Sequence, residues 1–420
     1  MLKKSKFITV AALTALLVAP LSACGSSNEG GSGTNEGASG DQTTITYFSW
    51  ANTKKVSKII ETFEKENPDI KIDVSGAAGG ANEYVQTLMT RISGGQVPDV
   101  FHISTATKND VISGGWARDL TNEPFMKGLD PTGVAQYTVD GKAYGMTPTV
   151  WMGTIIFNKK LLKDVGYDKV PTTLKEFNEM GKKLNEKGIT PYMEDPNVIS
   201  GSFVPMLGGW YAKNAPASDQ ELFDGKETFE KQWTPLLTQW QTMIDSNTMP
   251  KTVVGVPKDQ IQQLFLQGKL AMYRSGMWDA GTIREAGIEF EAAPFPAFEG
   301  GEAFVGGGPD SPFAISSKIE GKKLEAAQKF LSFINSEEGL KLLDSEVGQL
   351  SSSANWKAEV PAEFKDVYDN YIQTGKYYWL NWPKNGPVMA KEMTAQFQLM
   401  IQGTETPQQA AANLDAKWSK

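Results

Sequence analysis

The chain of 420 residues contains a single cysteine, Cys24, and this limits how any fold it adopts can be held together. No intrachain disulfide can form, and a metal site built from several cysteines is excluded. A stable fold must therefore rest on a hydrophobic core, and a chain of this length is long enough to bury one. Residues 45–420 are sufficient for about two or three domains.

Cys24 ends a short run of small residues that follows a basic start and a mostly apolar stretch, 7–19. This order predicts an export signal over 1–23 and a lipid attachment site at Cys24. It resembles the lipobox of bacterial lipoproteins, in which the cysteine thiol is acylated. A permanent membrane span is disfavoured, because spanning takes about 20 apolar residues and two threonines interrupt this stretch. The Gly, Ser and Asn residues after Cys24 disfavour its burial in a core and predict a flexible tether over 24–44.

Charge and rare residue types exclude several classes of function. The formal net charge is −8 at pH 7, whereas nucleic-acid binding needs a basic surface; we attribute the acidity to solubility. His102 is the only histidine, which disfavours serine–histidine triads and multi-histidine metal sites, and we expect no metal and no cofactor. Only four arginines occur, which weakly favours an uncharged ligand, since carboxylates and phosphates are usually bound by Arg. Eleven tryptophans occur, and we expect well over half of them to fill the core.

Strands and helices alternate over the first part of the folded chain. Periodicity predicts strands over 44–50, 70–74 and 99–103, with helices over 56–63 and 83–92 between them. This alternation predicts a parallel α/β sheet, whose ligands lie beyond the C-terminal ends of the strands. Further along, the sequence predicts a hairpin over 137–145 with an Asp-Gly turn, a strand over 150–158 and a helix that begins after Thr173. Strands over 270–273 and 312–315, an extended stretch over 292–298 and further helices complete the chain.

The order of these segments resembles the sugar-binding group of extracytoplasmic solute-binding proteins of bacterial ABC importers, related to maltose-binding protein. The likeness rests on segments that run along nearly the whole chain after the tether, namely 45–50, 63–68, 94–100, 140–148, 157–161, 267–272, 313–316 and 337–340. It implies a two-lobed α/β fold of the type II periplasmic-binding-protein class, with a ligand cleft between discontinuous lobes. The implied lobes are 45–150 plus 296–346 and 151–295 plus 347–420, with crossings near 150–153, 293–296 and 347–350.

The resemblance also implies a function. We expect an extracellular protein, lipid-anchored to the outer face of the cell membrane, that captures a carbohydrate, in particular an oligosaccharide, by hinge closure. We expect it to deliver that ligand to the transmembrane subunits of an ABC transporter with a cytoplasmic ATPase, to act as a monomer and to have no enzymatic activity. Two alternatives are a secreted glycoside hydrolase, which needs a pair of carboxylates, and a sugar sensor that partners a membrane receptor.

Candidate ligand contacts come from predicted strand ends and from segments that the family uses. Glu83 has a second interpretation as a charge favoured by the helix dipole, and Trp379 as a helix-packing residue. Trp278 and Asp279 form the strongest pair, because the family commonly places a stacking tryptophan there. We expect the glycine run 306–308 to let the ligand approach the backbone. The run lacks the lysine and spacing of a nucleotide-binding loop, so we reject phosphate binding there. The full set of expected ligand contacts is Trp50, Glu83, Ser104, Thr105, Trp151, Glu194, Asp195, Trp278, Asp279, Gly307 and Trp379.

Overall fold

The computed structural model describes residues 42–77, 81–198, 201–310 and 312–419. The predicted export signal, the lipid attachment site at Cys24 and nearly all of the predicted tether lie outside these residues. The described residues from 42 onwards belong to one compact unit of the chain.

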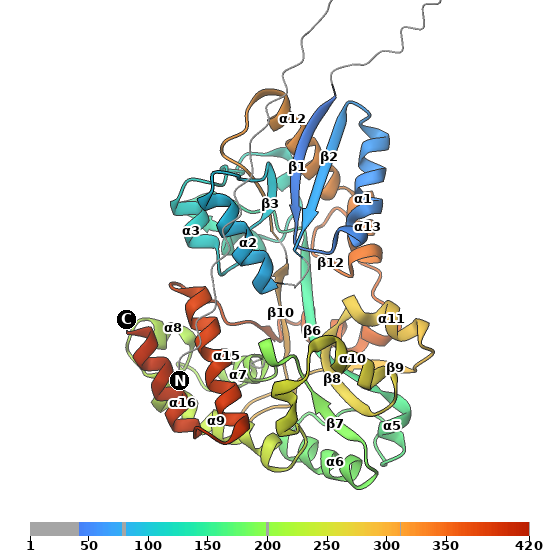
Figure 1. Ribbon diagram of the computed structural model, residues 1–420, viewed down its shortest axis with the longest axis vertical. Helices are drawn as coiled ribbons and strands as arrows, with labels where there is room; N and C mark the ends of the chain where they lie inside the picture. Colours follow the sequence, from blue (N-terminus) through green and yellow to red (C-terminus); the bar gives the residue numbers. More distant parts are fainter. Residues whose placement is uncertain (1–41, 78–80, 199–200, 311, 420) are drawn as a thin grey trace, which may run out of the picture. The chain divides into compact units, whose positions relative to one another are not determined.

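The first sheet has four strands in the order β11-β3-β1-β2 (Figure 1). Strands β1 (Thr43–Ser49), β2 (Ile70–Gly76) and β3 (Val100–His102) are parallel, which confirms the predicted parallel α/β arrangement. Strand β11 (Phe313–Ile315) joins β3 in the antiparallel direction. Asp99 lies at the start of β3 and accepts hydrogen bonds from the backbone N–H of Thr46, at 2.8 Å, and from its hydroxyl, at 3.1 Å. These bonds give Asp99 a structural role at the start of β3.

Helices and short strands accompany this sheet, and Figure 1 shows α1 alongside β2. Asp140 and Gly141 both have positive φ between β4 and β5, which is the backbone geometry of the predicted Asp-Gly hairpin turn. The elements are α1 (Thr53–Glu66), α2 (Ala81–Ser93), α3 (Lys108–Ser113), a 3-10 turn (Pro124–Met126), α4 (Pro131–Gln136), β4 (Thr138–Val139), β5 (Lys142–Ala143), α12 (Gly321–Ile334), α13 (Glu337–Leu342) and a π-helical turn (Leu343–Val347).

The second sheet is built around the long strand β6 (Thr149–Asn158), in the order β13-β10-β6-β8-β7. Strands β10 and β8 flank β6 in the antiparallel direction, and β9 and β12 also pair with it. Strand β7 is parallel to β8, and β13 is parallel to β10. These strands are β7 (Thr190–Met193), β8 (Leu270–Gly276), β9 (Phe290–Ala293), β10 (Val305–Asp310), β12 (Leu350–Ser351) and β13 (Tyr377–Tyr378).

Most of the remaining chain is helical. Thr173 caps α6, where its hydroxyl accepts from the backbone N–H of Glu176 at 3.3 Å, as the sequence spacing predicts. Among the described residues, no helix is long and apolar enough to cross a bilayer. The helical elements are α5 (Lys159–Lys163), α6 (Leu174–Glu186), a 3-10 turn (Pro196–Val198), α7 (Phe203–Tyr211), α8 (Asp219–Phe223), α9 (Phe229–Asp245), a 3-10 turn (Lys251–Gly255), α10 (Lys258–Leu266), a 3-10 turn (Met277–Asp279), α11 (Ala280–Glu285), α14 (Ala362–Val367), a π-helical turn (Tyr368–Ile372), α15 (Gly386–Gln402) and α16 (Pro407–Trp418).

Buried apolar side chains form three cores. Two of them draw on residues 45–146 and 313–347, whereas the largest draws on 152–305 and 350–418. We therefore keep the division into two discontinuous lobes as a proposal. One boundary needs correction, because Phe298 and Val305 belong to the largest core although they lie after the expected crossing near 293–296. We propose that this crossing lies in β10 instead.

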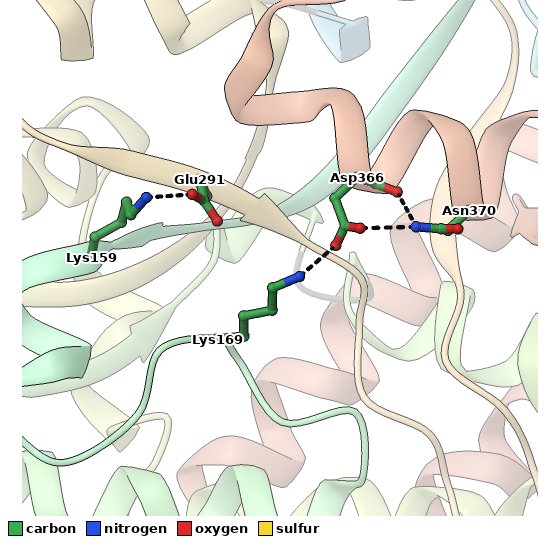
Figure 2. A network of polar contacts seen from close by, with 5 residues as sticks. All are labelled: Lys159, Lys169, Glu291, Asp366 and Asn370. Carbon is green, nitrogen blue, oxygen red and sulfur yellow. Dashed lines mark hydrogen bonds and ion pairs between the residues drawn. The ribbon is translucent and has the colours of Figure 1, made fainter.

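Surface ion pairs tie the edge of the second sheet to its helices (Figure 2). Lys159 pairs with Glu291 of β9, and Lys169 reaches the carboxylate of Asp366 in α14 at 3.2 Å. Asn370 donates to the same carboxylate at 2.9 Å. Such exposed pairs contribute at most about 1 kcal/mol each, so we assign the stability of this region to its core.

Candidate functional site

Three glycines lie in register across the middle of the second sheet. Gly153 of β6 is paired with Gly306 of β10 on one side and with Gly276 of β8 on the other. Residues directly opposite each other in antiparallel strands present their side chains to the same face. One face of three neighbouring strands therefore carries a strip without side chains, which we call the glycine row.

The indole of Trp151 lies on the glycine row. A Cβ atom placed on Gly153 would lie 2.7 Å from Cζ3 of Trp151, and one on Gly306 would lie 3.2 Å from its Cη2. Trp379 packs edge-to-face against this indole, with ring centroids 5.1 Å apart and an interplanar angle of 85°. Two of the expected ligand contacts, Trp151 and Trp379, are thus in direct contact.

Trp278 covers the other end of the glycine row. It follows β8 in a 3-10 turn, and a Cβ atom on Gly276 would lie 2.3 Å from its Cζ3. Only glycine at position 276 leaves room for this ring. Both Trp151 and Trp278 are half-buried, so each still presents part of its ring to solvent.

The other tryptophans lie in a hydrophobic core or pack against one. Trp233, Trp240 and Trp418 are buried, and six more are half-buried against one of the three cores, as the sequence predicted for well over half of them. Trp151 and Trp278 are the two that belong to no core and pack against none. Burial in a core therefore does not account for these two, and they are the rings best suited to stacking on a ligand.

Asp279 holds the turn that carries Trp278. Its carboxylate accepts a hydrogen bond from Tyr273 at 3.1 Å and another from Ser275, and only 9% of the residue is exposed. Its Oδ2 is thus engaged twice within the protein, and little of the carboxylate is exposed to a ligand. We therefore correct the expectation for Asp279 from a ligand contact to a residue that positions Trp278.

Glu194 is also removed from the set of ligand contacts. It is fully buried, and its carboxyl oxygens lie 2.9 Å from the hydroxyl of Ser202 and 3.1 Å from that of Tyr192. Burial raises the pKa of Glu194 to about 8, although both hydroxyls and the charge of Arg274 act in the opposite direction. Its neighbour Asp195 is half-buried and accepts the backbone N–H of Asn197 at 2.9 Å, which shapes the following turn.

Gly307 faces away from the glycine row. A Cβ atom on it would lie 3.0 Å from Cβ of Tyr377, whereas its neighbours Gly306 and Gly308 face Trp151. The glycine run therefore seats aromatic rings on both faces of β10. The expected contact of Gly307 with the ligand stays a prediction, on the face of β10 that carries Tyr377.

The expected contacts on the first sheet follow its strand ends. Trp50 comes directly after β1 and contacts Tyr84, with ring centroids 4.8 Å apart. Glu83 is exposed in the first turn of α2, next to Tyr84. The Ser104 hydroxyl accepts from the backbone N–H of Thr107 at 3.2 Å, and Thr105 beside it is half-buried. These residues remain candidate ligand contacts.

Hydrogen bonds connect the first-sheet segments to those that carry the tryptophans. Asn109, at the start of α3, donates to the carbonyl of Pro383 at 2.5 Å. Lys55 of α1 donates to the carbonyl of Trp278 at 3.3 Å. The ends of β1 and β3 are thus followed by segments that contact the Trp278 turn and the stretch after Trp379.

Sequence reasoning missed one residue beside the glycine row. Nη2 of Arg274 lies 3.4 Å from the position that a Cβ of Gly153 would occupy, next to the Trp151 ring. The sequence held a usable signal, because Arg274 is two residues before Gly276 on the same strand and shares its face.

Comparisons with known proteins identify the class that this fold and site define. The model of the bacterial extracellular solute-binding protein family matches residues 58–366, and the chain belongs to that family. A family 1 extracellular solute-binding protein from Bifidobacterium longum subsp. infantis, of known structure, is 40% identical with a TM-score of 0.73, over 90% of this chain and 100% of that one. The predicted family and the two-lobed α/β fold are thereby confirmed.

Curated relatives are more distant in sequence. The multiple sugar-binding protein of Streptococcus mutans is 26% identical over 79% of this chain and 78% of its own length. The maltooligosaccharide ABC transporter solute-binding lipoprotein of Streptococcus pneumoniae is 23% identical over 87% of this chain and 84% of its own length. Both relatives are named as binding proteins, which agrees with the expectation of a binding protein.

Proposed function

We propose that this protein captures a carbohydrate outside the cell and delivers it to the permease of an ABC transporter. The observation that carries the proposal is the pair of half-buried indoles, Trp151 and Trp278, that lie on the glycine row and pack against no core. The S. mutans relative is named for sugars and the S. pneumoniae relative for a maltooligosaccharide ABC transporter, which supports this ligand class and this partner.

The aromatic surface suits a saccharide because sugar rings have apolar C–H faces and polar edges. Trp151, Trp379 and Trp278 would cover the apolar faces, while hydroxyl and carboxylate groups at the ends of β1 and β3 bind the edges. Glu83, Ser104 and Thr105 are the polar candidates. Closure of the two lobes would then remove the ligand from water, and the net affinity is what remains after the free energy of closure is subtracted.

The proposal includes an anchor to the outer face of the cell membrane. Cys24 would carry the lipid, and the tether would end before β1, because Thr43 and Thr44 belong to that strand. Residues 24–41 lie outside the described residues. The S. pneumoniae relative is named a lipoprotein, which supports this assignment. We propose a monomer, with no enzymatic activity of its own.

The test is a titration of the full chain with a panel of mono- and oligosaccharides, followed by tryptophan fluorescence and calorimetry. We expect saturable binding of at least one saccharide without its cleavage. Trp278→Ala and Trp151→Ala should each weaken this binding at least about tenfold, as truncation of a central aromatic contact does.

Trp116→Ala is the matched control, because Trp116 is a half-buried tryptophan packed against a core of the first sheet. It should leave the affinity unchanged. Cleavage of the saccharide would contradict a pure binding function, and absence of any response across the panel would contradict the ligand class. Unchanged affinity in both site variants would remove the glycine row from the binding site.

A further inference from the structure

Arg274 is a cation fixed next to the proposed stacking surface. Its Cδ and Nε both lie 2.7 Å from where a Cβ of Gly201 would be, so the stem packs closely against that glycine. Its Nη2 and the Trp151 ring flank the same point above Gly153, at 3.4 Å and 2.7 Å. The residue remains partly exposed.

The four arginines differ in their partners. Arg91 donates to Ser75 at 3.0 Å, Arg118 donates to the carbonyl of Ile319 at 2.7 Å, and Arg284 forms an ion pair with Glu363 at 2.8 Å. No hydrogen bond or ion pair to the described residues is found for the guanidinium of Arg274, and its Nε is buried without a partner.

Glu194 interacts electrostatically with Arg274, but the two form no ion pair. Glu194 follows Met193, which is paired with Tyr273, so Glu194 and Arg274 lie on adjacent parallel strands. The Glu194 carboxyl is bound by Tyr192 and Ser202 instead, and burial raises its pKa to about 8, so it is largely protonated at neutral pH. A partly buried guanidinium is thus left with unused donors, and such a charge is costly unless an anion pairs with it.

We propose that Arg274 donates to a carboxylate on the bound sugar, so that the ligand is a saccharide containing a uronic acid. The inference rests on the proposed function and specifies its ligand. A carboxylate accepts two parallel hydrogen bonds from a guanidinium, whereas a hydroxyl leaves the charge uncompensated. Nη2 lies beside the Trp151 ring, so it is placed to meet a carboxylate at the edge of a sugar stacked on that ring. This would overturn the weak preference for an uncharged ligand that the scarcity of arginine suggested.

The experiment compares matched saccharides that differ only at C6. The full chain is titrated calorimetrically with galactobiose and digalacturonate, and with cellobiose and cellobiouronate. In at least one pair we expect the acidic member to bind about 10- to 100-fold more tightly, the range for a charge-assisted hydrogen-bonded pair. Added salt should reduce this preference.

Variants separate the roles of charge and geometry. Arg274→Gln should abolish the preference for the acidic member, and Arg274→Lys should restore only part of it, because lysine lacks the planar fork. Arg284→Gln removes a cation that is bound to Glu363 elsewhere in the chain. This variant should preserve the preference for the acidic saccharide. Thermal unfolding of each variant shows whether the fold is intact.

The outcomes distinguish this inference from the proposed function. Equal or tighter binding of the neutral members, or an equal loss for both members in Arg274→Gln, overturns the assignment of a uronate while carbohydrate binding stands. If no member of either pair and no saccharide of the wider panel binds, the proposed function is wrong, and this inference is wrong with it.

Discussion

At the scale of single residues, carboxyl groups near the site divide into engaged and free ones. Both carboxyl oxygens of Glu194 and one of Asp279 are bound by neighbouring hydroxyls, whereas Glu83 is exposed. The engaged carboxyl groups shape the protein beneath the tryptophans, and the exposed one is available to a ligand.

The buried carboxyl of Glu194 predicts a pH dependence of stability. Its pKa rises from an ordinary value of 4.5 to about 8 in the folded protein, mainly through burial. Between these values the folded state binds more protons than the unfolded state, so the free energy of unfolding falls as the pH rises. Glu194→Gln mimics the protonated acid, so it should reduce the fall in unfolding free energy between about pH 5.5 and pH 8.5 by roughly 3 kcal/mol.

Denaturant unfolding at the two pH values measures this difference. Glu83→Gln is the control, because that side chain is exposed, and it should leave the pH dependence as it is in the unaltered protein. A Glu194→Gln variant with an unchanged pH dependence would show that Glu194 is ionised in the folded protein.

The structure brings the aromatic candidates together more closely than the polar ones. Trp151, Trp278 and Trp379 were predicted from crossing segments, a strand end and a resemblance, and the structure seats the first two on the glycine row. Glu194 and Asp279 were expected to face a ligand, but the structure turns them towards hydroxyls that lie within eight residues of them in the sequence. Residue types alone do not show whether a hydroxyl will bind a given carboxylate in the folded protein.

At the scale of elements, the glycine row depends on three strands keeping one register. A one-residue slip of β10 or β8 against β6 would turn Gly306 or Gly276 to the opposite face and place a side chain under an indole. The tryptophan surface is thus a property of the sheet and not of any single strand.

A methyl group in the glycine row should disturb ligand binding. In Gly153→Ala the new Cβ would lie 2.7 Å from Cζ3 of Trp151, which forces the ring to move. We expect the affinity for the best saccharide to fall about tenfold or more, as for other displaced aromatic contacts, measured by calorimetry. In Gly308→Ala the only atom within 4 Å of the new Cβ is Nε1 of Trp151, at 3.7 Å, so this control should bind normally.

Equal losses of affinity in Gly153→Ala and Gly308→Ala would mean that the effect comes from disturbed strand pairing and not from displacement of the Trp151 ring. An unchanged affinity for Gly153→Ala would mean that the position of the Trp151 ring does not matter to the ligand.

Elements with a strong local signal were predicted, and those set by tertiary contacts were not. The Asp-Gly turn and the three parallel strands have such signals. Helix α9 runs through Pro235, which sequence rules treat as a helix breaker, yet buried Trp233 and Trp240 hold the helix in place. Short strands such as β12 and β13 form because they pair with β6 and β10, respectively.

At the scale of the whole molecule, capture and anchoring are assigned to separate parts of the chain. Every candidate ligand contact lies between positions 50 and 379, whereas the proposed lipid site is Cys24. A tethered protein close to its permease has a raised effective concentration without any new contact.

Removal of the proposed anchor should leave capture intact. We expect Cys24→Ala to bind saccharide as the unaltered chain does, since no described core or site residue is changed. The variant should be lost from the membrane fraction of cells and recovered in the surrounding medium or periplasm, as measured by fractionation and immunoblotting. Ser27→Ala, three residues away, is the control and should stay with the membrane.

Loss of saccharide binding in Cys24→Ala would mean that Cys24 belongs to the folded part of the molecule. Full membrane retention of the variant would assign attachment to another segment.

The glycine row also affects the conformational entropy of binding. Long side chains beneath a ligand would lose rotamer freedom when it arrives, at about 0.5–1.5 kcal/mol for each one that becomes ordered. Glycine has no rotamers to lose, and the packing of Trp151 against Trp379 and the backbone already restricts its indole. A sugar that stacks here contacts a surface that is already ordered in the folded sheet. Less conformational entropy is lost on binding, so more of the contact free energy remains as affinity.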